Sequence, residues 1–331
     1  MSDASLDERV SGYLVSRHRL GQVEVQVLSG DASTRRYFRV VGPEGNAVLA
    51  LYPEPFDPEE LPFVLVARLM AAWGLPLPAI LDTDGTRGIL LLEDLGDVML
   101  QDALTASPSR TAEYYRRAMD QIGQLQREAG RGPAEAPCFQ IAFDADKLEW
   151  ELQYFLKHFV EGHRGTDVTV DDRVALGKDF RALAEEIASW PRVLCHRDYH
   201  SRNLMVNRDE LYWVDFQDAR MGPATYDLAS LLRDSYVELD EAFIAEAAES
   251  FRARVLPSEP RDVFARRFDL MCVQRNLKAL GTFGYMDVVR GSRVYLQYVP
   301  RTLAHARRNL ALRPELADLR RRLARYIPEL A

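Results

Sequence analysis

The sequence predicts an α+β protein of two lobes: a small N-terminal lobe built on an antiparallel sheet and a large, mainly helical C-terminal lobe. In the N-terminal part, apolar and polar residues alternate, as at Val23, Val25 and Val27, which is typical of half-buried strands. Later in the chain, long amphipathic segments are separated by glycine and proline. The length of 331 residues suffices for both lobes. We place the N-lobe at 1–92, a hinge at 93–97 and the C-lobe at 98–331.

The N-lobe is expected to contain a helix at 5–18, strands at 23–27 and 47–52, a helix at 58–73 and a buried strand within 87–97. The segment SGDASTRRYFRV, residues 29–40, places glycine and hydroxylated residues between two strands. Most such turns are plain hairpins, but backbone amides and hydroxyls there can also approach phosphate. Together with the motif described below, this makes Gly30, Ser33 and Thr34 candidate phosphate-binding residues.

The hinge follows the apolar run RGILLLEDLGD, residues 87–97. Exposed backbone groups from Glu93 to Leu95 could bind the edge of an adenine, or the segment could be an ordinary strand end. Beyond it, helices are expected at 109–130, 144–160 and 171–190. On the second of these, Trp150, Tyr154 and Phe155 form a stripe that is expected in the core. Glu151 on the same turn is a candidate substrate contact.

The segments LCHRDYHSRNLMV, residues 194–206, and LYWVDFQD, residues 211–218, place ionisable groups in two turns between short strands. A lone aspartate in a turn is usually a cap, but H-x-D-x-x-x-x-N followed by a second aspartate is the pattern of kinase catalytic and metal loops. Phosphoryl transfer from ATP needs a carboxylate that orients the attacking hydroxyl and oxygen ligands for Mg²⁺. We assign Asp198 as the base, with Asn203 and Asp215 as the Mg²⁺ ligands. His196 is expected to be structural, and His200 stays undecided.

Kinases usually pair the phosphates with a lysine on the third strand of the small lobe. The first lysine of this chain is Lys147, and Arg68 stands where such enzymes often carry a glutamate partner for that lysine. Positive charge for the phosphates is therefore expected from Mg²⁺ or from Arg35 and Arg36, the arginines closest in sequence to the glycine-containing turn.

After the metal loop, the sequence GPATYDLASLLRD predicts a helix that opens near Pro223, because proline is tolerated in a first turn. Asp227 on that helix is expected to accept backbone amides of the catalytic loop. A further helix at 273–285 carries Arg275 and Lys278 one turn apart. Two solvated cations is the favoured interpretation of this pair.

The net charge of −8 argues against a nucleic-acid surface. Three cysteines without C-x-x-C spacing indicate neither a zinc site nor a disulfide framework. The acidic N-terminus and the charged or proline-containing apolar stretches predict no signal peptide and no membrane span. We expect a monomeric cytoplasmic protein.

Together these motifs resemble the aminoglycoside phosphotransferase-like kinases and, more narrowly, the bacterial anomeric kinases of N-acetylmuramate and N-acetylglucosamine. HRDYHSRN and VDFQD carry the wider resemblance; DASTRRYFR, GPATYDLASLLRD and QRNLKALGTF carry the narrower one. The resemblance spans nearly the whole chain. It implies a bilobal protein-kinase-like fold, ATP and Mg²⁺ as cofactors, and transfer to the C1 hydroxyl of an amino sugar in cell-wall recycling. It also implies that Asp218 is a second metal or substrate contact.

Two alternatives remain at this point. One is a kinase for an aminoglycoside or another amino alcohol, which would need an acid-lined site; the cations Arg220, Arg233, Arg275 and Lys278 lean instead toward a sugar acid. The other is a nucleotide-binding pseudokinase, suggested by the missing lysine, although Asp198, Asn203 and Asp215 are intact. If N-acetylmuramate is the acceptor, Arg233, Arg275 or Lys278 is expected to meet its carboxylate.

Overall fold

The computed structural model describes residues 7–17, 22–28, 34–43 and 45–331, and the chain divides into two compact units. The first unit comprises residues up to 98 together with 205–217, and the second comprises 99–204 together with 218–331. The segment 205–217, which follows the catalytic-loop motif, therefore packs with the N-terminal residues and not with its sequence neighbours.

The first unit is built on an antiparallel sheet of five strands in the order β1-β2-β3-β5-β4. The strands are β1 (Glu24–Leu28), β2 (Arg36–Gly42), β3 (Gly45–Leu51), β4 (Ile80–Asp84) and β5 (Ile89–Glu93). Every second residue of β2 and β3 is apolar, so Phe38, Val40 and Leu49 share one face, where they form a core with Val10 and Tyr13 of α1 (Glu8–Ser16). The period-two alternation thus produced a half-buried sheet, as predicted, with Val23 and Val25 packed against this core; Val27, predicted on the same face, is 71% exposed.

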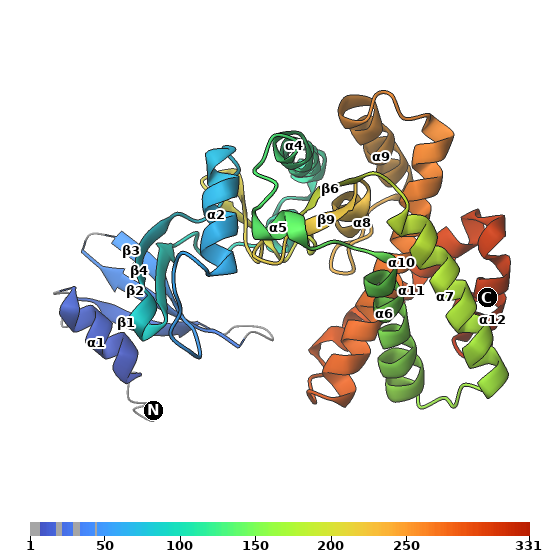
Figure 1. Cartoon of the computed structure of the whole chain (residues 1–331), viewed down its shortest axis with the longest axis horizontal. Helices are drawn as coiled ribbons and strands as arrows, with labels where there is room; N and C mark the ends of the chain where they lie inside the picture. Colours follow the sequence, from blue (N-terminus) through green and yellow to red (C-terminus); the bar gives the residue numbers. More distant parts are fainter. Residues whose placement is uncertain (1–6, 18–21, 29–33, 44) are drawn as a thin grey trace. The chain divides into compact units, whose positions relative to one another are not determined.

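Helix α2 (Pro62–Ala72) and the hairpin of β7 (Leu204–Asn207) and β8 (Glu210–Trp213) complete the first unit. The Phe63 and Phe216 rings pack with centroids 4.8 Å apart, and the Trp213 amide donates to the Pro76 carbonyl at 2.8 Å. In Figure 1 the hairpin lies beside α2. These contacts explain why 205–217 belongs to the first unit.

The second unit is mainly helical and is arranged around α10 (Arg261–Val288), which Figure 1 shows among α6, α7 and α11. Its other helices are α3 (Leu100–Ala106), α4 (Thr111–Ala129), α5 (Pro137–Gln140), α6 (Ala145–Phe155), α7 (Val170–Ala188), α8 (Tyr226–Leu232), α9 (Glu241–Val255), α11 (Val299–Leu312) and α12 (Ala317–Ala324). Within the described ranges, no helix is both long and apolar enough to cross a bilayer.

Helix α6 does not continue regularly to residue 160 as the sequence predicted, because residues Leu156–His163 form a π-helical segment. This segment crosses α10 at Gly284, where an added Cβ would lie only 2.3 Å from the His158 carbonyl oxygen. Gly281, about one turn earlier, is also confined, because an added Cβ there would lie 2.8 Å from Phe155 Cα. Glycine is needed at both positions because the two backbones approach closely.

The helix expected to open at Pro223 begins later, so that prediction is wrong. Residues Arg220–Pro223 form β9, which pairs antiparallel with β6 (Arg192–Cys195), and α8 starts at Tyr226. Proline is acceptable at the end of a short strand because it lacks only the amide donor. The strand pair β6–β9 anchors the start of the catalytic loop, residues 196–203.

Candidate active site

The catalytic loop is held by a buried carboxylate at the start of α8. Asp227 accepts the amide of His196 at 2.7 Å and the amide of Arg197 at 3.0 Å, which confirms its predicted structural role. Arg197 has a φ of 88°, a region that residues with a Cβ rarely occupy. The two bonds to Asp227 offset that backbone strain, since they satisfy amides that the turn would otherwise bury without an acceptor.

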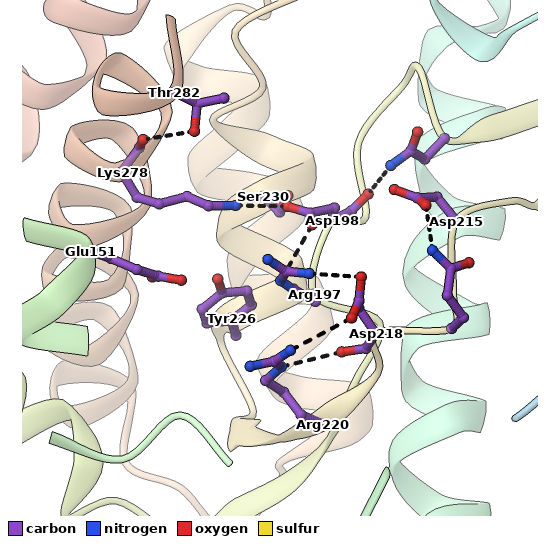
Figure 2. A network of polar contacts seen from close by, with 12 residues as sticks. Glu151, Arg197, Asp198, Asp215, Asp218, Arg220, Tyr226, Ser230, Lys278 and Thr282 are labelled. Atoms are coloured by element: carbon purple, nitrogen blue, oxygen red, sulfur yellow. Dashed lines mark hydrogen bonds and ion pairs between the residues drawn. The ribbon is translucent and has the colours of Figure 1, made fainter. Parts of the chain in front are cut away.

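Asp198, the predicted base, follows directly and is surrounded by cations. Lys278 Nζ lies 2.8 Å and Arg275 Nη1 3.4 Å from Asp198 Oδ1, and Figure 2 shows the Lys278 side chain directed at this carboxylate. Arg197 Nε lies 3.5 Å from Asp198 Oδ2. Burial alone would raise the pKa of the Asp198 carboxyl, but these cations hold that pKa well below its usual value. Asp198 is therefore an ionised group, ready to accept a hydrogen bond.

Arg275 and Lys278 are not the solvated pair that the sequence favoured. Arg275 is 8% exposed and also donates to Tyr226 Oη at 3.0 Å and Ser230 Oγ at 2.7 Å. The Lys278 side chain is 16% exposed. The reason is that α10 is surrounded by other helices, so that its polar side chains face either a neighbour or a pocket.

Asn203 lies at the other end of the loop and is fixed by it. Its Nδ2 donates to the Asp198 carbonyl at 2.9 Å, and its amide donates to the His200 carbonyl at 2.9 Å. The Ser201 amide is held by Asp234 at 2.9 Å. Because the side-chain nitrogen Nδ2 of Asn203 donates within the loop, the side-chain oxygen Oδ1 is the atom left to bind a metal ion.

Asp215 belongs to the first unit, where it follows β8 with a φ of 62°. Its side chain is 47% exposed, Gln217 Nε2 donates to it at 2.7 Å, and Arg35 Nη2 lies 3.8 Å from its Oδ1. Asp218 belongs to the second unit, where it pairs with Arg197 at 2.9 Å. The two aspartates of the VDFQD segment therefore belong to different units and have different partners.

A pocket of about 530 Å³, part of which is open to solvent, adjoins Asp198 within the second unit. Its lining includes Asp198, His200, Tyr236, Arg275, Lys278 and Phe283. Burial, assisted by Arg275 and Lys278 and opposed by Asp198, lowers the pKa of His200 to about 3. At neutral pH, His200 thus presents a neutral imidazole to a pocket that two carboxyl groups, Asp198 and Asp234, and three cations line.

Two further candidates from the sequence are already engaged by neighbours. Arg233 lines the pocket, but both its terminal nitrogens bind Glu241, at 2.6 and 2.9 Å. Glu151 is 2% exposed and accepts a hydrogen bond from Gln274 at 2.8 Å. Both contacts are charge-assisted, so these side chains shape the site more readily than they bind a ligand.

Of the residues predicted to bind nucleotide, Gly30 and Ser33 lie outside the described residues. Thr34 is exposed, and Arg36 pairs with Asp7 at 3.0 Å. Arg35 lies near Asp215, as described above. The side chains of Glu93 and Leu95 are engaged within the protein, because Glu93 Oε2 accepts a hydrogen bond from the Ala79 amide at 3.2 Å and Leu95 is buried.

Sequence reasoning missed Arg39, which extends from β2 to the predicted hinge. Its guanidinium pairs with Asp94 at 2.7 Å and with Asp97 at 2.8 Å. No motif singled out Arg39, although the alternation of β2 placed it opposite the buried face. Sequence reasoning also assigned no role to Lys147, the first lysine of the chain, which lies 3.8 Å from Glu151.

Comparison with known proteins agrees with this arrangement. The model of the phosphotransferase enzyme family matches residues 24–261. An N-acetylmuramate/N-acetylglucosamine kinase of Pseudomonas aeruginosa is 35% identical, over 89% of this chain and 86% of that protein. A kinase of the same name from Neisseria meningitidis serogroup B is 32% identical, over 88% of this chain and 87% of that protein.

Among solved structures, a choline/ethanolamine kinase family protein from Mesorhizobium loti superimposes with a TM-score of 0.61 and 16% identity, over 98% of both chains. This likeness establishes the bilobal protein-kinase-like fold. The family match over most of the chain and the two relatives above 30% identity lead to one conclusion. The chain belongs to the phosphotransferase enzyme family, and it is an enzyme that transfers a phosphoryl group to a hydroxyl acceptor.

Proposed function

We propose that this enzyme is an ATP-dependent sugar kinase that phosphorylates the anomeric hydroxyl of N-acetylmuramate and N-acetylglucosamine. The observation that carries the proposal is the charge of the pocket beside Asp198: its lining holds three basic side chains, Arg233, Arg275 and Lys278, and two acidic ones, Asp198 and Asp234. The names of the relatives supply the amino sugars. The reaction would return cell-wall sugars to metabolism in the cytoplasm, where ATP is available, and we propose that the enzyme acts as a monomer.

Asp198 would accept a hydrogen bond from the attacking hydroxyl and receive its proton as the phosphorus–oxygen bond forms. A strongly held carboxylate is a weak base, so it suits an acceptor that is itself acidic. An anomeric hydroxyl is more acidic than an ordinary alcohol. Transfer through a loose transition state then requires mainly that Asp198 position the acceptor in line.

The residues present fit Mg²⁺, which favours hard oxygen ligands and is usually bound by one or two carboxylates together with substrate phosphates and water. Asn203 offers an amide oxygen and Asp215 a half-exposed carboxylate. The described residues contain no cluster of three or more His, Cys, Asp or Glu side chains, so an all-protein metal cage is not expected. Bound Mg²⁺ would neutralise charge on the ATP phosphates.

Of the two arginines in the first unit, Arg35 is assigned in preference to Arg36 as the cation that balances the charge of the ATP phosphates. Arg35 lies near Asp215 and has a side chain only 15% exposed, whereas Arg36 is 57% exposed and pairs with Asp7. A guanidinium at this place can engage phosphate with two parallel hydrogen bonds. Thr34 and, outside the described residues, Gly30 and Ser33 are proposed to approach the same phosphates, and the backbone from Glu93 to Leu95 the adenine.

On the acceptor side, Arg275 and Lys278 are proposed to contact the sugar beside Asp198. Arg233, which Glu241 holds, would form the pocket wall behind them. Asp218 would act through Arg197, to which it is paired, and Glu151 through Gln274.

An aminoglycoside or another amino alcohol is the competing acceptor, but a polycation would meet Arg275 and Lys278 in the pocket. A panel of amino sugars, aminoglycosides and choline with ATP, read out as ADP formed, tests the choice. We expect turnover with the N-acetylated sugars. Turnover confined to the amines would contradict the proposal.

A further inference from the structure

Trp150 of α6 stands outside the core in which the sequence placed it. It is 54% exposed, whereas Trp190 and Trp213 are 8% and 0% exposed. A single exposed apolar side chain is ordinary, whereas a contiguous group of them often marks a binding site. The neighbours of Trp150 therefore decide whether it belongs to a site.

The Trp150 ring is the first of a row of rings in the second unit. Its centroid lies 5.2 Å from that of Tyr154, whose ring lies 4.3 Å from His158 and 5.7 Å from Tyr285 of α10. Tyr154 in turn packs against the backbone of α10 at Gly281, where an added Cβ would lie 3.1 Å from its ring. The indole is thus packed against a ring that α10 confines, and the two rings form a platform.

Lys147 places a cation at this platform. Its Nζ lies 4.0 Å from the centroid of the Trp150 ring and 3.8 Å from Glu151 Oε1, which is beyond hydrogen-bond distance. Burial lowers the pKa of Lys147; Glu151 opposes that shift, and Arg197 and Arg220 add to it. The Lys147 side chain is 28% exposed, so its ammonium is open to a ligand as well as to Glu151.

The same group of side chains reaches the predicted base. Glu151, one residue after Trp150, is bound by Gln274, the neighbour of Arg275, and Figure 2 shows Glu151 directed toward Tyr226. Lys147 adjoins the same carboxylate, with its Nζ 3.8 Å from Glu151 Oε1. All of these residues, and the platform, belong to the second unit.

We propose that Trp150 and Lys147 form a subsite of the acceptor site, in which the indole takes the carbon–hydrogen face of an N-acylated pyranose and the Lys147 ammonium binds an acidic substituent of that sugar. The inference deepens the proposed function and rests on it for the class of acceptor. Lys147 suits this role better than Arg233 or Arg275, which already hold Glu241, Tyr226 and Ser230. A cationic acceptor is disfavoured, because the Lys147 ammonium would repel it.

The test compares Trp150→Ala, Trp150→Phe, Lys147→Met and, as a matched control, Lys157→Met, whose lysine is exposed on the following π-helical segment. Steady-state constants are measured for N-acetylmuramate and N-acetylglucosamine. Trp150→Ala should raise KM for both sugars roughly tenfold with kcat nearly unchanged, and Trp150→Phe should keep KM close to the wild-type value. Lys147→Met should raise KM roughly tenfold for N-acetylmuramate alone, and Lys157→Met for neither.

The proposal is overturned if KM for both sugars is unchanged in Trp150→Ala, or if Lys147→Met affects the two sugars equally. An unchanged KM together with a shift from dimer to monomer in light scattering would show instead that the rings contact a second copy of the chain. Should the wild-type enzyme phosphorylate neither sugar, the proposed function fails. Calorimetric affinity for N-acetylmuramate then decides the subsite: weaker binding by both variants supports it, and unchanged binding refutes it.

Discussion

At the scale of single residues, the surroundings of Asp198 favour orientation of the acceptor over strong deprotonation. Lys278, Arg275 and Arg197 all lie within 3.5 Å of its carboxylate oxygens. They keep it ionised in a largely buried place and at the same time reduce its basicity. An acceptor hydroxyl that ionises readily is the natural counterpart of such a base.

Replacing Asp198 with Ala or Asn should lower kcat by roughly 10² to 10⁴, because a positioned base contributes about that much. ATP affinity should change little, since the group acts on the acceptor. The Asn variant keeps the volume and one oxygen for Lys278, so a loss seen in both variants is not due to unfolding. Turnover within a few-fold of wild type in either folded variant would rule out this role.

Asp215→Asn should weaken ATP binding at least about tenfold in the presence of Mg²⁺ and hardly at all in its absence, because the change removes an anionic ligand from a hard cation. Calorimetric titration of ATP with and without Mg²⁺ measures both quantities. Asp209→Asn, in the turn between β7 and β8, is the control. If Asp215→Asn keeps the wild-type dependence on Mg²⁺, the residue is not a ligand.

The positions of Asp198 and Asn203 could be predicted from the sequence because their spacing places both in one loop. Asp227 is the confirmed case: its two amide bonds follow from a carboxylate near the start of a helix beside that loop. Arg275 and Lys278 could not be placed in this way, because one turn of a helix looks the same whether it faces solvent or a pocket. Only the central position of α10 decides that they reach Asp198.

At the scale of elements, the helices and strands largely follow hydrophobic periodicity, and the departures have local causes. Residues 220–223 pair with β6 because a second strand was available there, which no local propensity near Pro223 reveals. The π-helical turns after α6 lie where the chain must pass close to Gly284 of α10. Both departures depend on residues far away in sequence.

Gly284→Ala should destabilise the protein by about 1–3 kcal/mol, because the added Cβ would overlap the His158 carbonyl oxygen. That oxygen belongs to the backbone, so it cannot move aside unless the helical segment that carries it shifts. Gly177→Ala in the interior of α7 is the matched control: the contact nearest to its Cβ, Gln153 Nε2 at 3.6 Å, is ordinary, and the change should be neutral or stabilising. Urea unfolding of both variants gives the comparison. Equal free energies of unfolding for Gly284→Ala and wild type would contradict the close approach.

At the scale of the whole molecule, the residues with predicted roles are divided between the two units, and one segment from the middle of the second unit's sequence packs with the first. Residues 205–217, which carry Asp215, pack with the sheet unit, whereas Asp198 and Asn203 belong to the helical unit. The sequence indicated both lobes but placed this segment with its neighbours in the chain. Packing of Phe216 on Phe63 determines the assignment, and such a contact is not visible in a periodic pattern.

The central claim is that Asp198 directs phosphoryl transfer to an anomeric hydroxyl. It is tested most directly by offering the enzyme free N-acetylmuramate and N-acetylglucosamine beside their methyl glycosides, in which C1 is blocked, and following the products by phosphorus NMR. We predict a sugar 1-phosphate from each free sugar and no product from either glycoside. Phosphorylation of the glycosides at the rate of the free sugars would contradict the account.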